Sequence, residues 1–276
     1  MTTDDWRNAL DETALLEALV HSPWRRIDVV AQTGSTNADL IARAAAGEDI
    51  DGVALVAEHQ TAGRGRNGRS WSAVAGTQVT MSVGVNADDI PNSAWGWIPL
   101  VAGLAVLDAV AAVGVDAGLK WPNDVLARPP ARGKLAGILA EVAAPAPVIV
   151  IGIGLNVSLR ADELPDPGAT SLALLGGRPT DRRDLIVALL DGLSRRIEGL
   201  RAVRGADAPL MAEYTARSLT IGERVRATLP GDRELVGDAA HVDDQGRLGI
   251  DTGGETVVVS AGDIVHLRPF EGVGSG

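Results

Sequence analysis

Apolar residues in the first 217 positions gather into short runs separated by glycine, proline and polar clusters, and such runs predict β-strands. From Thr77 to Val85 apolar and polar residues alternate, which is typical of a strand with one buried face. Leu135–Val142 and Val148–Val157 are apolar almost throughout, so we expect them to be neighbouring strands at the centre of a sheet. Two shorter runs, Ile27–Ala31 and Val53–Glu58, are expected to be strands as well.

Helical periodicity and capping residues predict five helices around these strands. Trp95–Val113 is hydrophobic on nearly every face, which is typical of a buried helix, and a glycine ends it. The expected helices are Asp4–Val20, a helix capped by Ser35 or Thr36 and ended by Gly47, Trp95–Val113, a helix capped by Thr180 with its apolar face from Leu185 to Ile197, and Ala208–Ala216.

After Arg217 the chain changes to short β-type runs separated by glycine-containing turns, and this spacing predicts a small β-barrel. We therefore expect a first domain at residues 1–217, a barrel at residues 218–270 and a disordered tail at residues 271–276. The expected strands are Glu223–Leu229, Glu234–Val242, Arg247–Asp251, Thr256–Val259 and Val265–Arg268.

Composition narrows the class of protein. Of 276 residues 46% are hydrophobic but only 3% aromatic, so the core is expected to consist of Ala, Val, Leu and Ile. The net charge of −11 argues against a protein that covers DNA or RNA, because such binding depends on a basic face. There is no cysteine, and therefore no disulfide or thiolate metal site. The N-terminus does not resemble a signal peptide, and no uninterrupted apolar run spans a membrane, so we expect a cytoplasmic protein.

The stretch His59–Trp71, here called the arginine loop, alternates small and cationic residues. Its glycines are Gly63, Gly65 and Gly68, and its arginines are Arg64, Arg66 and Arg69. Glycine allows close approach of backbone N–H groups to a ligand, and arginine offers a planar fork for carboxylate or phosphate. The loop is therefore suited to an anion, although a solvated surface loop or an Arg-Gly segment that touches nucleic acid has the same composition.

Other polar residues stand at the ends of apolar runs. Lys120, Asn123 and Asp124 surround a Trp-Pro pair, Lys134 precedes one central run, and Asn156 interrupts the end of the other. Each could be a solvated strand end, a turn or a cap. Together they predict a polar site at one edge of the sheet, because burying a charged group without a use is costly.

Five motifs occur in a fixed order: TGSTN, HQTAGRGRNGRSW, LKWPNDV, KLAGILAEV and GIGLNV. In this order they closely resemble biotin protein ligases, over roughly Ile27 to Arg268. The resemblance implies an α+β fold of the class II synthetase type, with a mixed or antiparallel sheet against helices and an SH3-like C-terminal barrel. It also implies that ATP and biotin form biotinyl-5′-AMP with Mg²⁺, and that biotin then passes to one lysine of the biotin carboxyl carrier domain of a carboxylase.

The resemblance assigns roles to residues through these motifs. Lys134, Arg66 and Asp124 are the catalytic candidates; Lys134 would bridge the biotin carboxylate and the α-phosphate, and Asp124 would bind Mg²⁺ or receive a proton from the acceptor lysine. The residues expected to bind biotin are Ser35, Thr36, Asn37, Gln60, Gly63, Arg64, Gly65, Arg66, Lys134 and Gly137. Those expected to bind ATP are Arg66, Arg69, Trp71, Lys120, Asn123, Lys134 and Asn156.

Two features depart from the resemblance. Only Met1–Arg26 precede the first strand, too few for the winged-helix domain of the ligases that are also repressors, so we expect one function, no specific DNA and no membrane. The segment Ala127–Gly133 is longer and richer in proline than expected, which leaves the distance from Asp124 to Lys134 open. Two alternatives to a biotin protein ligase remain: a lipoate-type ligase or acyltransferase among enzymes, and a nucleic-acid-binding protein among non-enzymes.

Overall fold

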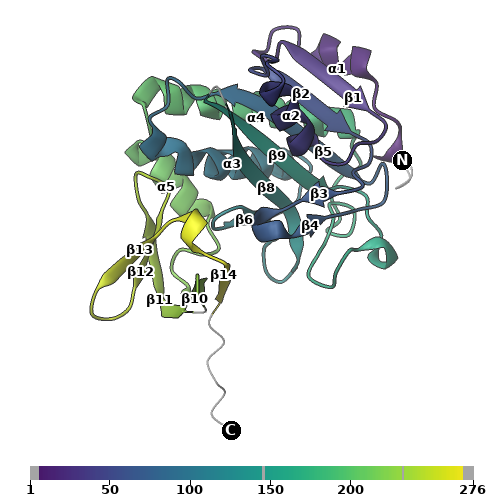
Figure 1. Ribbon diagram of the computed structural model, residues 1–276. Helices are drawn as coiled ribbons and strands as arrows, with labels where there is room; N and C mark the ends of the chain where they lie inside the picture. The colour runs from purple at the N-terminus through teal and green to yellow at the C-terminus, as the bar shows by residue number, and fades with distance from the viewer. Residues whose placement is uncertain (1–5, 145–146, 232, 270–276) are drawn as a thin grey trace.

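The computed structural model describes residues 6–144, 147–231 and 233–269, so the predicted tail lies outside the described residues. Figure 1 shows a larger unit, in which helices flank a twisted sheet, and a smaller β unit formed by the C-terminal strands. The larger sheet has seven strands in the order β1-β2-β5-β9-β8-β7-β6. Its members are β1 Arg26–Val30, β2 Val53–Ala57, β5 Gln78–Asn86, β6 Ala117–Lys120, β7 Asp124–Ala127, β8 Lys134–Ala143 and β9 Val148–Asn156.

The sheet is mixed, because β1 and β2 run parallel and every other neighbouring pair is antiparallel. Strands β8 and β9 are adjacent and central, as predicted. A separate two-stranded ladder joins β3 Gly63–Arg64 to β4 Ser70–Trp71 within the arginine loop. The 3₁₀ turn Arg66–Gly68 lies between them.

Both faces of the sheet are covered, because β2 places alternate residues in two separate hydrophobic clusters. Val53 and Leu55 pack with α2, while Ala54 and Val56 face the larger cluster with α3 and α4 (Figure 1). The helices are α1 Glu12–Ala18, α2 Thr36–Ala45, α3 Ile98–Ala112, α4 Arg182–Val203 and α5 Ala208–Arg217. This arrangement confirms an α+β fold with a mixed sheet against helices.

The prediction that β5 is half-buried was wrong. Its apolar residues face α3 and α4, as the alternation indicated, but its polar residues Gln78, Thr80 and Ser82 are also buried. They lie under α2 and the arginine loop, where side-chain hydrogen bonds satisfy them. The polar face of β5 is therefore the inner surface of a site and does not face solvent.

Two helix starts also differ from the prediction. The first helix begins at Glu12, where the Asp11 side chain accepts hydrogen bonds from two backbone N–H groups, and not near Asp4. Helix α4 is capped by Asp181 and not by Thr180. Thr180 and Asp181 can each cap a helix, and the backbone conformation decides whether the Thr180 hydroxyl or the Asp181 carboxylate reaches the free N–H groups. Ser35 caps α2, as predicted.

One helical segment of the described chain, Asn92–Ala112, is long and apolar enough to cross a membrane by length and composition alone. It comprises a 3₁₀ turn, Asn92–Trp97, followed by α3. Of its apolar window 72% is buried, and α3 packs against α4 and the sheet. Its hydrophobicity is thus that of a core helix, as the sequence predicted.

The C-terminal strands form a five-stranded antiparallel sheet in the order β13-β12-β11-β10-β14. They are β10 Arg224–Leu229, β11 Arg233–Val242, β12 Leu248–Asp251, β13 Thr256–Val259 and β14 His266–Pro269. Within the described residues no strand pairing joins β13 to β14, so the sheet remains open where a closed barrel was expected.

The two sheets share one hydrophobic core, and indole groups tie them together. Trp97 Nε1 donates to the Asp243 carbonyl and Trp121 Nε1 to the Gly246 carbonyl, at 3.0 and 3.1 Å. Trp97 also packs edge-on against Tyr214 of α5, with ring centroids 5.6 Å apart. The division at residue 217 stays a prediction, because the packing is continuous across it.

Candidate active site

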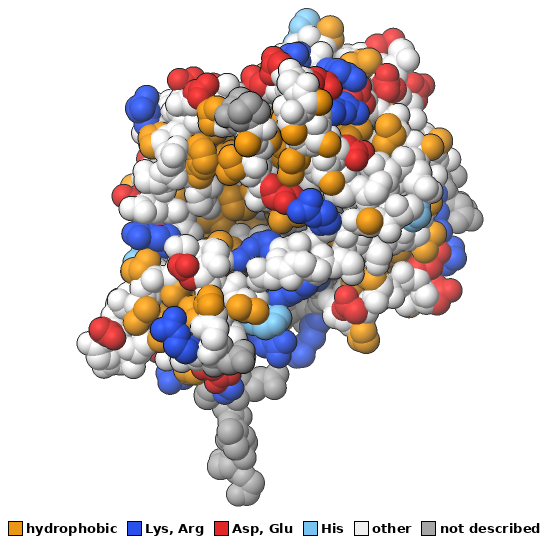
Figure 2. Space-filling model, in the orientation of Figure 1, with side chains coloured by type: hydrophobic (Ala, Val, Ile, Leu, Met, Phe, Trp, Pro, Cys, Tyr) orange, Lys and Arg blue, Asp and Glu red, His pale blue; other side chains and the backbone are white. Residues whose placement is uncertain are grey.

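A cavity of about 350 Å³ opens on the polar face of the sheet, over β5, β8 and β9. The start of α2, the arginine loop and residues 165–169 complete its walls. Figure 2 shows Lys and Arg side chains gathered where the smaller unit meets the larger one, beside the arginine loop. Fourteen of the predicted site residues line the cavity: Ser35, Thr36, Asn37, Gln60, Arg64, Gly65, Arg66, Arg69, Trp71, Asn123, Asp124, Lys134, Gly137 and Asn156.

Two predicted residues, Gly63 and Lys120, do not line it. Gly63 pairs with Trp71 inside the arginine loop, and an added Cβ would be 2.2 Å from the Trp71 carbonyl oxygen, so only glycine permits the β3–β4 pairing. Lys120 is the cross-strand neighbour of Asp124 and lines a much smaller adjoining pocket. Of the other two glycines in the loop, Gly68 has a positive φ, whereas a Cβ on Gly65 would be 3.5 Å from its nearest neighbour, an ordinary contact distance.

One end of the cavity carries a connected set of hydroxyl and amide groups. The Gln60 side-chain oxygen accepts from the backbone N–H of Thr36 at 2.8 Å and from its hydroxyl at 3.1 Å. The Thr36 hydroxyl also contacts Ser82 at 2.6 Å, and Ser82 donates to the Asn37 side-chain oxygen. Thr36, Asn37 and Ser82 are all buried. This end can pair with the polar atoms of a small neutral ligand.

Glu141 of β8 connects this end to the arginine loop. One carboxylate oxygen forms an ion pair with Arg64 at 2.6 Å, and the other accepts from the Asn37 amide at 2.9 Å. Asn37 in turn packs on Gly152: a Cβ added to Gly152 would lie 2.2 Å from the Asn37 side-chain oxygen. Glu141 therefore fixes a loop residue and a helix residue at the same time.

A close ion pair lines the cavity. Lys134 Nζ is 2.6 Å from a carboxylate oxygen of Asp124, and 5.3 Å from the centre of the Trp71 ring. The sequence left the Asp124–Lys134 distance open because of the long connection between them. A register shift between β7 and β8 accommodates that connection and brings the two side chains together.

Cations are crowded around this pair, and their environment is partly dry. Burial lowers the pKa of the Lys120 ammonium; Asp124 opposes the shift, whereas Lys134 and Arg69 add to it. Burial also lowers the pKa of the Arg66 guanidinium, again with Asp124 opposing. Cations that are desolvated and that repel one another are stabilised when an anion arrives. The middle of the cavity is thus suited to bind negative charge.

The floor of the cavity is bare backbone on which an indole rests. A Cβ on Gly154 would lie 2.4 Å from the Trp71 ring, and one on Gly137 would lie 3.1 Å from it. Trp71 Nε1 donates to Gln78 at 3.0 Å, and the Gln78 amide donates to the Asn156 side-chain oxygen at 2.5 Å. The two glycines therefore give a flat group access to the sheet surface.

Asn156 and Asn123 both bind the protein itself. The Asn156 amide donates to the carbonyls of Thr170 and Lys134, at 2.8 and 3.3 Å, which holds the chain after β9 against Lys134. The Asn123 amide donates to the Ile138 carbonyl at 2.8 Å, and its oxygen accepts from Arg66 at 3.4 Å. Both residues thereby fix the backbone on which the ion pair stands.

The arginine loop is also tied to the C-terminal unit, which sequence reasoning missed. Arg66 donates to the carbonyls of Ala261 and Ile264, and Arg69 donates to the Val265 carbonyl at 3.2 Å. The bonds end on backbone carbonyls, which no side-chain pattern reveals. Arg69 also contacts His266 Nδ1 at 2.8 Å; burial and the nearby Arg69 lower the pKa of that imidazole, which favours the neutral, accepting form.

Other lining residues were missed as well, among them Gln78, Thr80, Pro165 and Asp166. The signal for the first two was present, because polar residues alternate with apolar ones along β5. The same alternation also predicts a strand with one side facing solvent. The other two lie in a segment without periodicity, where the sequence carries no such signal.

Comparison with known proteins agrees with this geometry. Residues 33–157 match the Biotin/lipoate A/B protein ligase family, and residues 220–267 match the Biotin protein ligase C terminal domain. A biotin–[acetyl-CoA-carboxylase] ligase of Mycobacterium tuberculosis is 58% identical over 271 residues, which cover 96% of this chain and 98% of that protein. The chain belongs to the biotin protein ligase family.

Two further members of the biotin protein ligase family illustrate its range. A bifunctional ligase/repressor BirA of Bacillus spizizenii is 34% identical, over 82% of this chain and 68% of that protein. The structure of a biotin protein ligase from Aquifex aeolicus in complex with biotin and ATP matches with a TM-score of 0.75 and 26% identity. That match covers 89% of this chain and all of the other, so the biotin protein ligase fold extends over both units described above.

Proposed function

We propose that this biotin protein ligase activates biotin with ATP, releasing pyrophosphate, and transfers biotin from biotinyl-5′-AMP to a lysine of a biotin carboxyl carrier domain. Family membership supports the reaction, and the similar ligase from Aquifex aeolicus was found with both substrates. The observation that carries the proposal is Lys134, a cation 2.6 Å from Asp124 in the middle of a cavity with a neutral polar end and a flat floor.

The first step requires two anions to meet. A biotin carboxylate oxygen attacks the α-phosphorus of ATP, and the bond from that phosphorus to the leaving pyrophosphate breaks. Lys134 follows the reacting oxygens as a mobile point charge, while Arg66 supplies a fixed one. Fixed positive charge in a partly dry cavity stabilises the negative charge of the transition state. Arg69, which also lines the cavity, stabilises the pyrophosphate.

Biotin occupies the end of the cavity with the hydroxyl and amide groups. Ser35, Thr36 and Gln60 pair with the ureido head, since a buried polar head needs partners for its polar atoms. Gly137 leaves room for the fused rings, and Arg64 and Gly65 lie along the chain toward the carboxylate. Asn37, whose amide donates to Glu141, also lies at the biotin end. Gly63 contributes indirectly, because it permits the β3–β4 pairing within the arginine loop.

The nucleotide occupies the end bounded by β9 and residues 165–169. Trp71 offers its ring to adenine, and Asn123 and Asn156 fix the backbone around it. Lys120 lies behind Asp124 and adds positive charge for the phosphates. This placement leaves Lys134 at the boundary between the two substrates, where the new bond forms.

Asp124 fits a Mg²⁺ ion that arrives with ATP. Within the described residues no three His, Asp or Glu side chains form a metal site. Mg²⁺ typically binds one or two carboxylates together with substrate phosphates. Asp124 is one half-buried carboxylate, and it lies beside Lys134, which is proposed to contact the phosphate. When bound, the ion neutralises phosphate charge. In the transfer step the incoming lysine amine attacks the acyl carbon of biotinyl-5′-AMP, the bond from that carbon to the AMP oxygen breaks, AMP leaves, and Asp124 accepts the proton of the amine.

The substrate test compares biotin with lipoate and octanoate in an ATP-dependent assay of pyrophosphate release. We expect release with biotin, and rates with lipoate and octanoate that are lower by orders of magnitude. The reason is that an acid without a ureido head leaves the Thr36–Gln60 end without partners. Preference for either rival acid would instead establish a lipoate-type ligase.

Gly154→Ala should weaken binding of ATP, because the added Cβ would meet the Trp71 ring at 2.4 Å and displace it. We expect the affinity to fall about tenfold, as measured by calorimetry with a non-hydrolysable ATP analogue. Gly199→Ala is the matched control, since nothing lies within 4 Å of that position on α4. It should leave affinity unchanged, and equal affinities of both variants would contradict the placement of Trp71.

The acidic chain, with a net charge of −11, is proposed to act in the cytoplasm without specific DNA or a membrane. Its basic loop faces the cavity and the C-terminal unit and is therefore not spread over an open face. Any duplex binding should be weak and lost at physiological salt. A tight, sequence-selective complex in an electrophoretic assay would contradict this.

A further inference from the structure

One segment of the cavity wall is mostly exposed to solvent. Residues 160–168, here called the wall segment, run between buried Leu159 and buried Ala169, and most of them are exposed. Two of its residues, Pro165 and Asp166, line the cavity. At its far end the Lys134 backbone N–H donates to the Gly168 carbonyl at 2.6 Å.

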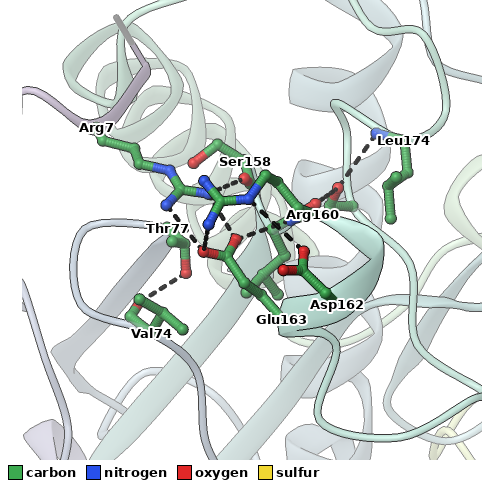
Figure 3. A network of polar contacts seen from close by, with 10 residues as sticks. Arg7, Val74, Thr77, Ser158, Arg160, Asp162, Glu163 and Leu174 are labelled. Atoms are coloured by element: carbon green, nitrogen blue, oxygen red, sulfur yellow. Dashed lines mark hydrogen bonds and ion pairs between the residues drawn. The ribbon is translucent and has the colours of Figure 1, made fainter. Parts of the chain in front are cut away.

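At its near end the wall segment is held by Arg7, which lies more than 150 residues away in sequence (Figure 3). Arg7 donates through both terminal nitrogens to the Glu163 carboxylate, at 2.6 and 3.1 Å, and also to the Ser158 carbonyl at 2.7 Å. Among the described residues, the side-chain hydrogen bonds that join the wall segment to the rest of the fold are these two to Glu163. Both partners are largely buried, with 19% and 10% of their side chains exposed.

The Glu163 carboxylate is a strong anchor. It also accepts from the Arg160 backbone N–H at 2.9 Å and from the Arg160 guanidinium at 2.6 Å. The hydrogen bond from Arg7, with help from Arg160, lowers the pKa of Glu163 to about 2. The carboxylate therefore stays ionised, and the contact stays intact, at every pH used in an ordinary assay.

Arg7 itself is presented from a fixed backbone. Trp6 is buried in the core, and the Asn8 carbonyl accepts from buried Arg182 at 2.7 Å. Arg182 forms an ion pair with Glu58 at 2.7 Å, and Glu58 accepts from the Leu10 backbone N–H. The N-terminal residues 6–10 are thus rigidly docked beside the end of β2. The guanidinium of Arg7 is therefore held in place by contacts that do not involve the wall segment.

We infer that Arg7 is a positioning residue for nucleotide binding: it orders the wall segment so that Pro165 and Asp166 close the ATP end of the cavity. The inference rests on the proposed function for the identity of the ligand. Both partners lie outside the stretches that match the two families, 33–157 and 220–267. Neither residue of the contact belongs to the five motifs that carry the family resemblance.

Arg7→Met tests the inference, because it keeps the length of the side chain and removes its charge. Glu163 retains Arg160, so no carboxylate is left without a partner and the protein should fold. In the ligand-free protein we expect residues 160–168 to exchange backbone hydrogens about tenfold faster. The KM for ATP should rise about tenfold while the KM for biotin and kcat change less than twofold. Arg7→Lys should give a KM for ATP between those of the wild type and Arg7→Met, since lysine keeps the charge but not the planar, two-pronged guanidinium.

Arg196→Met is the matched control. Arg196 is 15% exposed and pairs with Asp108 and Glu213 on the helices, so it resembles Arg7 in burial and bonding but does not line the cavity. It should leave both KM values and exchange at residues 160–168 unchanged. Unchanged exchange there in Arg7→Met, an unchanged KM for ATP, or equal increases in both KM values would overturn the inference. Exchange needs no substrate, so it tests Arg7 even if the wild type releases no pyrophosphate, the result that would refute the proposed function.

Discussion

Lys134→Ala should reduce formation of biotinyl-5′-AMP by about 10²–10³-fold while the protein remains folded. The ammonium stands where two anions join, and Lys134 is the one lysine among the described residues that line the cavity. Its side chain is 32% exposed and contributes little to the core, so the melting temperature should change little. Single-turnover release of pyrophosphate measures the chemical step directly.

Arg183→Ala is the control for loss of a cation, because Arg183 pairs with Asp184 on the exposed surface of α4. It should leave the rate at the wild-type value. Lys134→Arg distinguishes charge from shape: it restores a cation but not a compact one, and we expect partial activity. Near-normal pyrophosphate release from folded Lys134→Ala would refute the role assigned to this lysine.

Arg66→Gly should still form adenylate but retain it poorly. Arg66 connects the arginine loop to the carbonyls of Ala261 and Ile264 and to Asn123, and glycine removes all of these bonds. A loop without this anchor leaves the mixed anhydride open to water and to any amine. We expect biotinyl-5′-AMP to dissociate at least about tenfold faster and to label lysines of bystander proteins.

Asn67→Ala provides the comparison, since Asn67 shares the Ile264 carbonyl with Arg66 and also donates to the Val265 carbonyl, both at 3.3 Å, but does so with an uncharged amide. It should loosen the loop less and label bystanders little. Dissociation is measured by trapping released adenylate with an excess of a small amine. Equal dissociation rates for wild type and Arg66→Gly would show that the contact between the loop and the C-terminal unit does not retain the intermediate.

Much of the fold was predictable because packing and periodicity agree. Trp95–Val113 is apolar on all sides and α3 is indeed buried between the sheet and α4. The prediction failed where a local pattern has two tertiary outcomes. Polar residues alternate along β5 whether they face water or a cavity, and Thr180 and Asp181 are both competent caps. In each case the deciding contacts come from distant parts of the chain.

The site was predictable where its side chains belong to compact motifs, and not where backbone or distant segments complete it. The cavity brings together Lys134, Asp124 and Trp71 from three stretches, as their motifs indicated. The carbonyls that hold Arg66 have no signature in sequence. The role of Arg7 could not be predicted either, because a single arginine near the start of a chain gives no pattern, and its partner Glu163 is identified only in the structure.

The central claim is tested most directly by isolating the wild-type enzyme after incubation with biotin, ATP and Mg²⁺ and identifying the bound product by mass spectrometry. We predict biotinyl-5′-AMP on the enzyme, and its disappearance on addition of a biotin carboxyl carrier domain, with biotin recovered on a single lysine of that domain. An enzyme that forms no biotinyl-5′-AMP, or that forms the adenylate of lipoate or octanoate in preference, would contradict the account.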